Sequence, residues 1–211
     1  MLQLRKLYVD FVTADGTVCI AYVTRVRAAG LVFAPAGLER YDAHGRREVV
    51  RGRAELVLDH EPNTPELAHL HLVLAGQRYL LELSPEQAEP APSPNAPDDF
   101  VWRVKAARAH VRLTRLDGGA PPIEGTGYAD WVELERSPRA MRLARLHWGR
   151  LHLAAGTVIY TSLERTDGSC WRAATCWPQA QPARARAIEH WSLRSGADPA
   201  QHVLHLEDLD A

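Results

Sequence analysis

The stretch from Glu124 to Glu133 (EGTGYADWVE) carries residue types that could perform acid chemistry. If it forms a strand, Tyr128 and Asp130 share one face, because successive side chains of a strand point to opposite faces. A barrel interior on that side would hold a phenol beside a carboxyl group in apolar surroundings. Because burial raises the pKa of a carboxyl group, Asp130 would then keep a proton near neutral pH and could donate it to a substrate.

Other arrangements of this stretch lead to different functions. If the strand faces are reversed, Glu133 becomes the candidate acid. If the strand is simply bulged at Gly125 and Gly127, Tyr128 is a core residue and Asp130 is solvated. The two glycines would permit a bend or the close approach of another strand. An Asp130 on the outer face of a barrel would favour ligand binding without catalysis.

A second stretch, residues 147–152 (HWGRLH), could contribute to substrate binding. On a strand, Trp148 and Arg150 share a face, where a guanidinium group can pack near an indole ring or pair with a carboxylate. Ordinary packing explains the same pattern. Arg150 is therefore a candidate for positioning a polar group of the substrate, and Trp148 a candidate for the pocket wall.

Other sequence patterns of catalytic or cofactor-binding residues are weak. His69 and His71 share a strand face, as two metal ligands would, but no third ligand stands near them in the sequence. The sequence has no Gly-x-Ser-x-Gly motif, no phosphate-binding glycine-rich loop and no dinucleotide fingerprint. It therefore predicts no metal and no cofactor, and it does not support a kinase, a nucleotidase or a serine hydrolase.

The elements that must position these residues are predicted to be short antiparallel strands. Alternating and β-branched segments recur along the chain, separated by turn sequences such as Asp15-Gly16 and Ala75-Gly76-Gln77. This spacing predicts an all-β fold, either an antiparallel barrel or a closely packed β-sandwich, with few short helices. The predicted strands cover residues 18–24, 69–74, 79–83, 109–116, 128–135, 146–153 and 157–163.

Helical signals are few. Ser84-Pro85-Glu86-Gln87 has the spacing of a capping box and predicts one helical turn that ends before Pro90. Ser137-Pro138 predicts a similar turn. For residues 202–206 a helix and a strand both fit the pattern.

A proline-rich segment divides the chain. Residues 85–97 hold five prolines among small and polar residues, a composition that favours an exposed loop. We expect one unit over residues 1–211, with halves 1–88 and 98–211 joined by a surface loop at 89–97.

The composition limits the classes of partner. The chain has 211 residues, with Lys+Arg 25 against Asp+Glu 26 and a formal net charge of −1, so nucleic-acid binding through clustered cations is not expected. No apolar run approaches the roughly 20 residues of a membrane span, and residues 1–12 lack the features of a signal peptide. An odd number of cysteines, three, argues against a disulfide scaffold. We expect a cytoplasmic protein.

Several stretches together resemble the carotenoid 1,2-hydratase family (the hydroxyneurosporene synthases) and its AttH-like lipocalin-fold relatives. GTGYADW at 125–131, followed by a strand with Trp-Gly-Arg, is similar to the family motif Gly-x-Gly/x-Tyr-x-Asp-His-Asn-Trp-Gly and its later Trp-containing strand. KLYVD at 6–10, with Asp15-Gly16 after it, looks like the family's opening Trp-Trp-Tyr-Phe-Asp and Asp-Gly. WSLRSGA at 191–197, with Pro199, looks like its Trp-x-Ser-x-x-Ser/Thr-Gly-Ala-x-Tyr-Pro segment.

This resemblance implies a lipocalin-like antiparallel barrel with a hydrophobic pocket for isoprenoid or polyketide chains. Hydratases of the family protonate a C=C bond with an Asp and add water to the cation, and lipocalin-like relatives cyclise their substrates, including by Diels–Alder closure. When the family's motif residues are matched to this sequence one by one, Asp130 takes the position of the acid. Tyr128 takes the position of the motif Tyr. Tyr8 and Asp10 match the opening strand, and Trp148 approximates the later Trp.

The sequence departs from the family pattern at two places. After Asp130 the family's His-Asn-Trp-Gly is replaced by Trp-Val-Glu-Leu, so the motif His and Asn are absent. The opening Trp pair is replaced by Lys6-Leu7.

We therefore expect an enzyme that acts on an apolar isoprenoid- or polyketide-type substrate by acid-assisted hydration, isomerisation or cyclisation of C=C bonds. Its acid is Asp130, assisted by Tyr128. The expected substrate-binding residues are Tyr8, Asp10, Trp102, Trp131, Trp148 and Arg150. The alternative is a non-catalytic lipocalin-like carrier of a hydrophobic small molecule. An exposed edge strand would also allow pairing with a second copy, so a homodimer is an open alternative.

Overall fold

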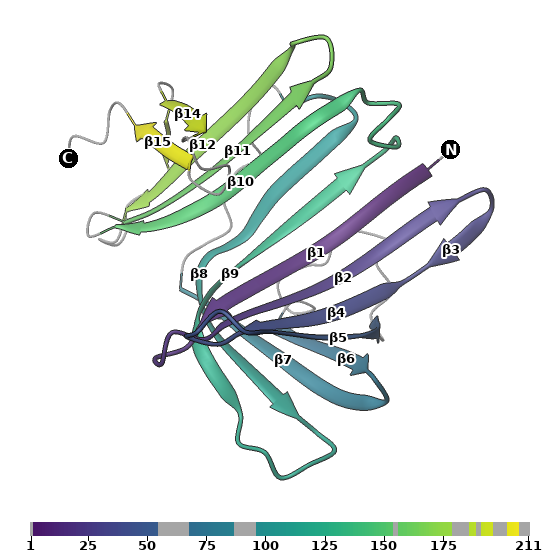
Figure 1. Ribbon diagram of the computed structural model, residues 1–211, viewed down its shortest axis with the longest axis vertical. Coiled ribbons are helices and arrows are strands. Elements are labelled where there is room, and N and C mark those ends of the chain that lie inside the picture. Colours follow the sequence, from purple (N-terminus) through teal and green to yellow (C-terminus); the bar gives the residue numbers. More distant parts are fainter. Residues whose placement is uncertain are drawn as a thin grey trace. The chain divides into compact units, whose positions relative to one another are not determined.

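The computed structural model describes residues 2–54, 68–86, 96–153, 156–178, 186–188, 191–195 and 202–206. The chain divides into two compact units, Met1–Met141 and Arg142–Ala211 (Figure 1). The predicted linker at 89–97 falls largely outside the described residues. Among the described residues, no helix is long and apolar enough to span a membrane.

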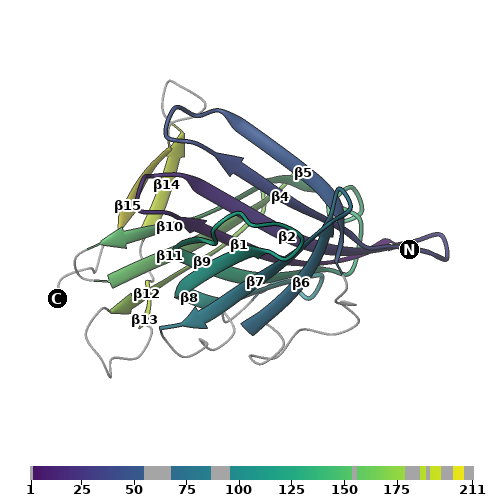
Figure 2. The same cartoon turned by 90° about the horizontal axis from the view of Figure 1, so that it is seen from below.

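The first unit is a closed barrel of antiparallel strands. Eight strands are hydrogen-bonded in the order β1-β9-β8-β7-β6-β5-β4-β2, and β2 pairs with β1 to complete the ring. Figure 2 shows the side of the ring on which β5 and β6 lie. The all-β fold predicted from the sequence is therefore confirmed. The strands of this unit are β1 (Leu2–Val12), β2 (Val18–Ala28), β3 (Leu31–Phe33), β4 (Pro35–Tyr41), β5 (Arg47–Ala54), β6 (His69–Leu74), β7 (Gln77–Pro85), β8 (Phe100–Arg115) and β9 (Ile123–Leu134).

Local sequence signals explain several of these boundaries. The tight turn predicted between β6 and β7 is present, with φ of 47° at Ala75 and 78° at Gly76, as a type I′ hairpin turn requires. Ser137 starts a turn in which its hydroxyl accepts from the Ala140 N–H at 3.2 Å. The predicted helical turn at Ser84 is wrong, because Ser84 and Pro85 continue β7 and pair with β8. Pairing across the sheet outweighs the local capping signal there.

Apolar side chains from seven strands fill the barrel interior as one core. Phe11 and Trp131 are fully buried and are among its largest members. At Gly127 an added Cβ would approach Phe11 Cβ to 2.8 Å and Val111 Cγ2 to 2.6 Å, so the absence of a side chain makes room for the core. The core comprises Leu7, Val9, Phe11, Cys19, Ala21, Val23, Ala36, Leu38, Leu70, Leu72, Leu74, Leu81, Leu83, Ala106, Ala109, Val111, Leu113, Ala129 and Trp131.

Strand β8 is irregular where it faces the candidate motif on β9. The pairing register shifts between Val104 and Ala106 and again between Ala106 and Ala109, opposite Asp130 and Ala129. Such bulges bend a strand and re-aim its side chains, and they are frequent beside functional sites.

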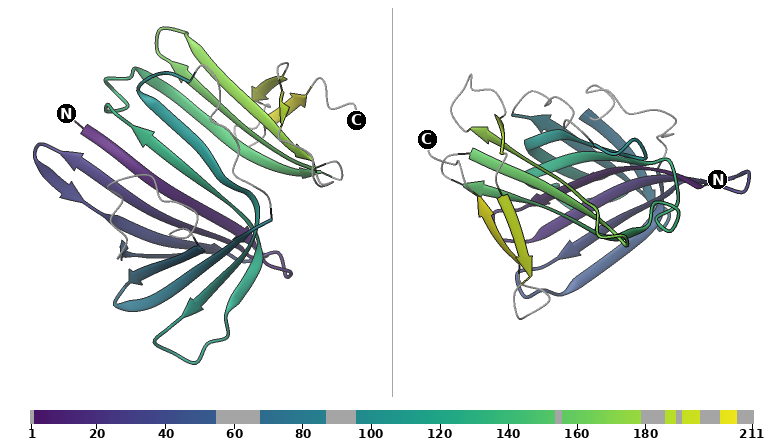
Figure 3. Two further views of the ribbon diagram at one scale, coloured as in Figure 1. Left: turned by 180° about the vertical axis from the view of Figure 1, so that it is seen from behind. Right: turned by 90° about the horizontal axis from the view of Figure 1, so that it is seen from above.

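The second unit contains a four-stranded antiparallel sheet in the order β10-β11-β12-β13 and a separate β14–β15 pair. The green to yellow-green strands in Figure 3 are β10 to β12. Its core includes Val158, Cys176 and Ile188, and the rings of Tyr160 and Trp191 lie 5.7 Å apart. Residues 202–206 form a strand, which decides between the two sequence interpretations. The strands are β10 (Leu143–Leu153), β11 (Gly156–Arg165), β12 (Cys170–Pro178), β13 (Arg186–Ala187), β14 (Trp191–Ser195) and β15 (His202–Leu206).

Candidate active site

Strands β2, β1, β9 and β8 lie side by side and place a polar and aromatic cluster on one face of the barrel wall. Tyr8 on β1 lies between Tyr22 on β2 and Asp130 on β9 in the strand register. Asp10 is paired with Tyr128 in the same way. Because side chains alternate along a strand, this face is opposite to the one that carries Leu7, Val9 and Trp131.

The expected orientation of the motif is therefore corrected. Tyr128 and Asp130 do not point into the barrel; the inward face of β9 is that of Ala129 and Trp131. The physical reason is packing, because the inward positions combine one large indole with small residues that leave space for Phe11. Asp130 is nevertheless buried, with 2% of its surface exposed, and Tyr128 has none exposed. The outer face is the position expected to favour ligand binding without catalysis, but the Asp130 carboxyl group is not solvated there, as the bulged-strand alternative requires.

Two donors converge on a single oxygen of Asp130. The Tyr128 hydroxyl donates to Asp130 Oδ2 at 2.8 Å, and Trp102 Nε1 on β8 donates to the same oxygen at 3.0 Å. The other oxygen, Oδ1, is buried and has no hydrogen-bond partner among the described residues. The carboxyl group is thus held at one oxygen, while the other is buried without a donor among the described residues.

Burial raises the pKa of Asp130 from its ordinary 3.8 to about 6. The hydrogen bonds from Trp102 and Tyr128 and the charge of Lys6 act in the opposite direction, and the Asp10 carboxylate adds to the rise. Desolvation is the largest effect, since a charged carboxylate is poorly solvated in such a place. Asp130 therefore keeps its proton to a higher pH than an exposed Asp.

Lys6 brings a cation to this cluster. Its Nζ lies 5.1 Å from the centre of the Tyr8 ring and 5.4 Å from that of Tyr22, a distance at which a ring face attracts a cation. Burial lowers the pKa of Lys6, while the charges of Asp130 and Glu39 counteract this shift. The Tyr8 ring also meets Tyr128, with ring centroids 6.5 Å apart.

The structure thus brings together five of the residues predicted from the sequence: Tyr8, Asp10, Trp102, Tyr128 and Asp130. Trp131 is separated from them, since it points into the barrel core.

Glu133, the alternative acid for reversed strand faces, is on the Trp131 side of β9. It forms an ion pair with Arg5, with Nε–Oε1 at 2.8 Å.

Trp148 and Arg150 belong to the second unit. They lie on one face of β10, across from Thr161 and Ile159 on β11, and Trp148 is 38% exposed. That they share a strand face agrees with the sequence pattern. Their part in substrate binding stays a prediction.

Sequence reasoning missed Lys6 and Tyr22 as members of the cluster. Lys6 shares the period-two face of Tyr8 and Asp10, so the alternation along β1 was a signal for it. Tyr22 could be found only through the β1–β2 register. His69, whose pairing with His71 was only a weak pattern for metal ligands, is largely exposed, and its Nε2 lies 3.8 Å from Glu82 Oε1. The described residues contain no group of three or more His, Cys, Asp or Glu that could hold a metal ion.

Comparisons with known proteins identify relatives by fold. No protein-family model matches the chain, and no curated protein matches it. Among solved structures, a candidate AttH from Nitrosomonas europaea has a TM-score of 0.51 at 15% identity, covering 91% of this chain and 70% of that one. Kievitone hydratase from Nectria haematococca has a TM-score of 0.53 at 9% identity, covering 97% of this chain and 73% of that one. At these identities the likeness concerns the fold: the chain has the lipocalin-like barrel architecture of these two proteins.

Proposed function

We propose that this protein is an enzyme that protonates a C=C bond of an apolar isoprenoid- or polyketide-type substrate, with Asp130 as the proton donor, leading to hydration, isomerisation or cyclisation. The observation that carries the proposal is the buried Asp130 carboxyl group, which has a pKa of about 6 and two donors on Oδ2. Within the part of the chain that the structure describes, Oδ1 has no donor. The motif resemblance and the fold shared with a kievitone hydratase support the same reaction class.

The hydrogen bonds indicate which oxygen carries the proton. An indole N–H and, in this contact, the phenol O–H both act as donors, so Oδ2 accepts twice and has the role of the carbonyl oxygen. In the neutral acid the hydrogen is then on Oδ1. Oδ1–H is then the proton of the carboxyl group that neither donor engages, while Trp102 and Tyr128 stabilise the carboxylate that forms after proton transfer.

The reaction follows from this arrangement. The Oδ1–H proton moves to one alkene carbon, the π bond breaks, and positive charge develops on the other carbon. The ring faces of Tyr8 and Tyr128 can stabilise that charge. In hydration, a water oxygen bonds to the cation and the proton released by that water restores neutral Asp130. In isomerisation, the carboxylate removes a different proton from the cation instead. In cyclisation, the π electrons of an internal alkene form a C–C bond to the cation, and the Asp130 carboxylate then removes a proton from the new cation, which gives a neutral cyclic alkene and restores neutral Asp130.

Lys6 matters for this scheme because it stands where the family pattern has Trp. A cation beside Asp130 favours the carboxylate form, so it helps Asp130 to release the proton and slows its recovery. The surroundings of Asp130 in this chain therefore differ electrostatically from a fully aromatic cluster.

The test is turnover of acyclic polyenes and other isoprenoid- or polyketide-type alkenes in D₂O and in H₂¹⁸O. Acid-assisted hydration places one deuterium on carbon and one ¹⁸O in the new hydroxyl. Asp130→Asn should lower the rate about 10²–10⁴-fold, the usual contribution of a general acid, and wild-type activity should fall as pH rises through about 6. Asp42→Asn, at an exposed turn where Asn also fits, is the matched control.

Two results would change the assignment. Loss of activity in Glu133→Gln with retention in Asp130→Asn would make Glu133 the donor. A carbon-detected NMR titration that finds Asp130 ionised with a pKa below 4 would remove the acid role altogether. The alternative is a carrier that binds its ligand inside the barrel, where Phe11 and Trp131 are packed at 0% exposure. The feature that favours the enzyme is the buried Asp130 carboxyl group, which a carrier of an apolar ligand does not need.

A further inference from the structure

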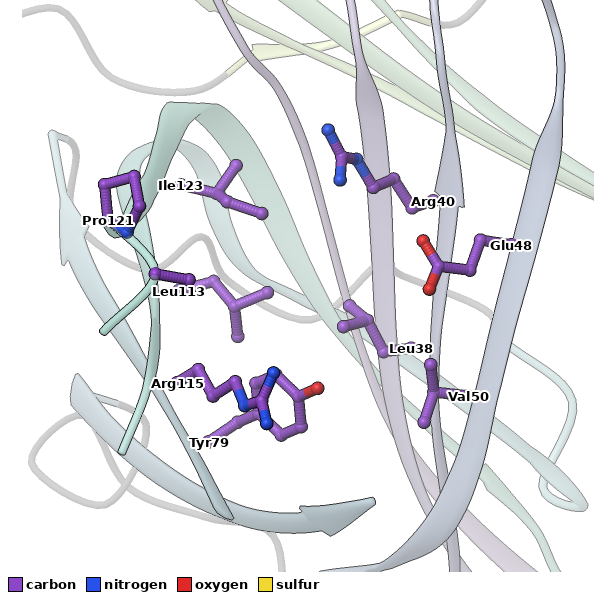
Figure 4. A pocket seen from close by; sticks show the side chains of 10 residues that line it. Leu38, Arg40, Glu48, Val50, Tyr79, Leu113, Arg115, Pro121 and Ile123 are labelled. Atoms are coloured by element: carbon purple, nitrogen blue, oxygen red, sulfur yellow. The ribbon is translucent and has the colours of Figure 1, made fainter. Parts of the chain in front are cut away.

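A cavity of about 160 Å³ lies at one end of the barrel (Figure 4). Its walls come from β4 and β5 on one side and from β7, β8 and β9 on the other, with the residues after β8 at its edge. Leu38 and Leu113 in its lining belong to the inward-facing core. The cavity therefore continues the barrel interior and is separate from the Asp130 cluster, which lies on the opposite face of the wall.

The deep part of the cavity is apolar. Val50, Tyr79 and Ile123 pack against the core beside Leu38 and Leu113. The Tyr79 hydroxyl already donates to Gln77 Oε1 at 2.8 Å, so Tyr79 contributes mainly ring surface. A cavity of this volume is comparable with the engineered apolar cavity of about 150 Å³ that binds benzene. It can accept a hydrocarbon group of about six carbons.

The charged lining has an excess of positive charge. Arg40 and Glu48 are direct cross-strand partners, so their charges offset one another. Arg115 stands on the opposite wall, beside Tyr79 (Figure 4), and its Nε is buried without a hydrogen-bond partner among the described residues.

Asp117, an acid that the charge of Arg115 affects, is engaged elsewhere. Arg115 helps to lower the pKa of Asp117 through its charge, but the Asp117 carboxylate accepts hydrogen bonds from the backbone N–H and the Nε of Arg78. A buried N–H on a guanidinium group loses free energy when it has no acceptor. An anionic acceptor in the cavity would satisfy it.

We propose that this cavity binds a small amphipathic monocarboxylate, whose carboxylate accepts from Arg115 and whose hydrocarbon part packs against Leu38, Val50 and Leu113. A neutral alcohol of the same length fills the apolar part but forms only a weaker, uncharged bond with Arg115. An alkylammonium ion is repelled by it. The site is thus selective for charge as well as for size, and it is independent of the proposed chemistry at Asp130.

The first measurement is an amide NMR titration of the intact chain with hexanoate, 1-hexanol and hexylammonium. Hexanoate should bind at least about tenfold more tightly than 1-hexanol, because a charge-assisted hydrogen bond contributes more than a neutral one. Shifts should centre on Val50, Leu113 and Ile123. Equal affinity for hexanoate and 1-hexanol, or shifts centred on Asp130, would overturn the proposal, and so would the absence of saturable hexanoate binding.

Variants separate the charge from the cavity. Arg115→Gln should weaken hexanoate about tenfold and leave 1-hexanol unchanged. Arg112→Gln removes the same charge from the opposite face of β8, where Arg112 faces Glu82 and Glu124, and it should leave both affinities unchanged. If Arg112→Gln weakens hexanoate as much as Arg115→Gln does, the effect is long-range electrostatics and the specific site is refuted.

Two further variants locate the site. Ala120 is exposed and lines the cavity, so Ala120→Trp should block binding of hexanoate and 1-hexanol without disturbing the core. Asp130→Asn should leave the hexanoate affinity unchanged. Undiminished hexanoate binding by a folded Ala120→Trp variant, or loss of binding in Asp130→Asn, would place the ligand elsewhere and contradict the proposal.

Discussion

The two faces of β9 are buried to the same degree but differ in what is buried. Ala129 and Trp131 on the inward face have no exposed surface and contact apolar neighbours in the barrel core. Tyr128 and Asp130 on the other face are 0% and 2% exposed, and they bring a hydroxyl and a carboxyl group with them. Adjacent residues of one strand therefore have very different environments.

This difference separates the residues that stabilise the barrel from those available for chemistry. On the inward face, the favourable free energy comes from packing and from removing apolar surface from water. On the outer face, Asp130 costs free energy when charged, because among the described residues donors reach Oδ2 and none reaches Oδ1. Proteins retain such unfavourable arrangements chiefly at functional sites. The comparison can be tested by altering each face separately.

The largest effect is expected on the inward face. Trp131→Ala should lower the free energy of unfolding by about 3–5 kcal/mol, because it removes a buried indole and leaves a cavity that the barrel can fill only partly. Urea denaturation at constant pH measures this. Trp148→Ala is the control, since Trp148 is 38% exposed and should cost less than about 1 kcal/mol. Similar losses of unfolding free energy in the two variants would contradict the assignment of Trp131 to the packed barrel core.

The contribution of the outer face to the free energy of unfolding should depend on pH. Asp130 has a folded-state pKa of about 6 against an ordinary 3.8. Below pH 3.8 both folded and unfolded chains are protonated there; between 3.8 and 6 the unfolded chain loses the proton first. The Asp130 contribution therefore falls as pH rises across this window, by about 3 kcal/mol in total.

The measurement is the free energy of unfolding of wild type and Asp130→Asn at several values between pH 4 and 8. The difference between them should change across this window, because the variant lacks the titration. A difference that stays constant with pH would show that Asp130 is not desolvated in the folded protein.

A side chain added on the inward face of β9 should also destabilise the barrel. In Gly127→Ala, the new Cβ would stand 2.3 Å from the Asp10 carbonyl oxygen, so β1 and β9 must move apart at a cost of about 1–3 kcal/mol. Gly119→Ala is the matched control, because nothing lies within 4 Å of a Cβ there. Thermal unfolding of the two variants tests this. An unchanged unfolding temperature in Gly127→Ala would mean that a Cβ fits between β1 and β9 without moving the strands.

The sequence predicted much of this arrangement because the signals are local. β-branched and alternating segments identified strands that became β2, β6 and β11, and the Ala75-Gly76 turn follows from its own residues. Gly125 and Gly127 permitted either a bend or the close approach of another strand, and the structure shows the close approach, with β1. The face shared by Tyr128 and Asp130 follows from alternation alone.

Alternation does not show which face of a strand points inward. Both faces of β9 carry an aromatic residue, so hydrophobicity does not decide between Tyr128 and Trp131. The decision comes from Phe11 and Val111, which need the space beside Gly127. Likewise, the bond from Trp102 to Asp130 joins residues of two strands through a bulged register. Neither the bulge nor the partner can be read from single segments.

The smallest predicted effect concerns the hydrogen bond from Tyr128 to Asp130. Tyr128→Phe keeps the ring but removes a hydrogen bond to Oδ2, so the pKa of Asp130 should rise by about one unit, equivalent to about 1.4 kcal/mol. A carboxyl-carbon NMR titration measures the change. Tyr22→Phe serves as the control, since the Tyr22 ring faces Lys6 and no bond to Asp130 is removed. A lowered Asp130 pKa in Tyr128→Phe would mean that water takes the place of the phenol hydroxyl. The main effect of Tyr128 on Asp130 would then be to exclude solvent, and its hydrogen bond would be secondary.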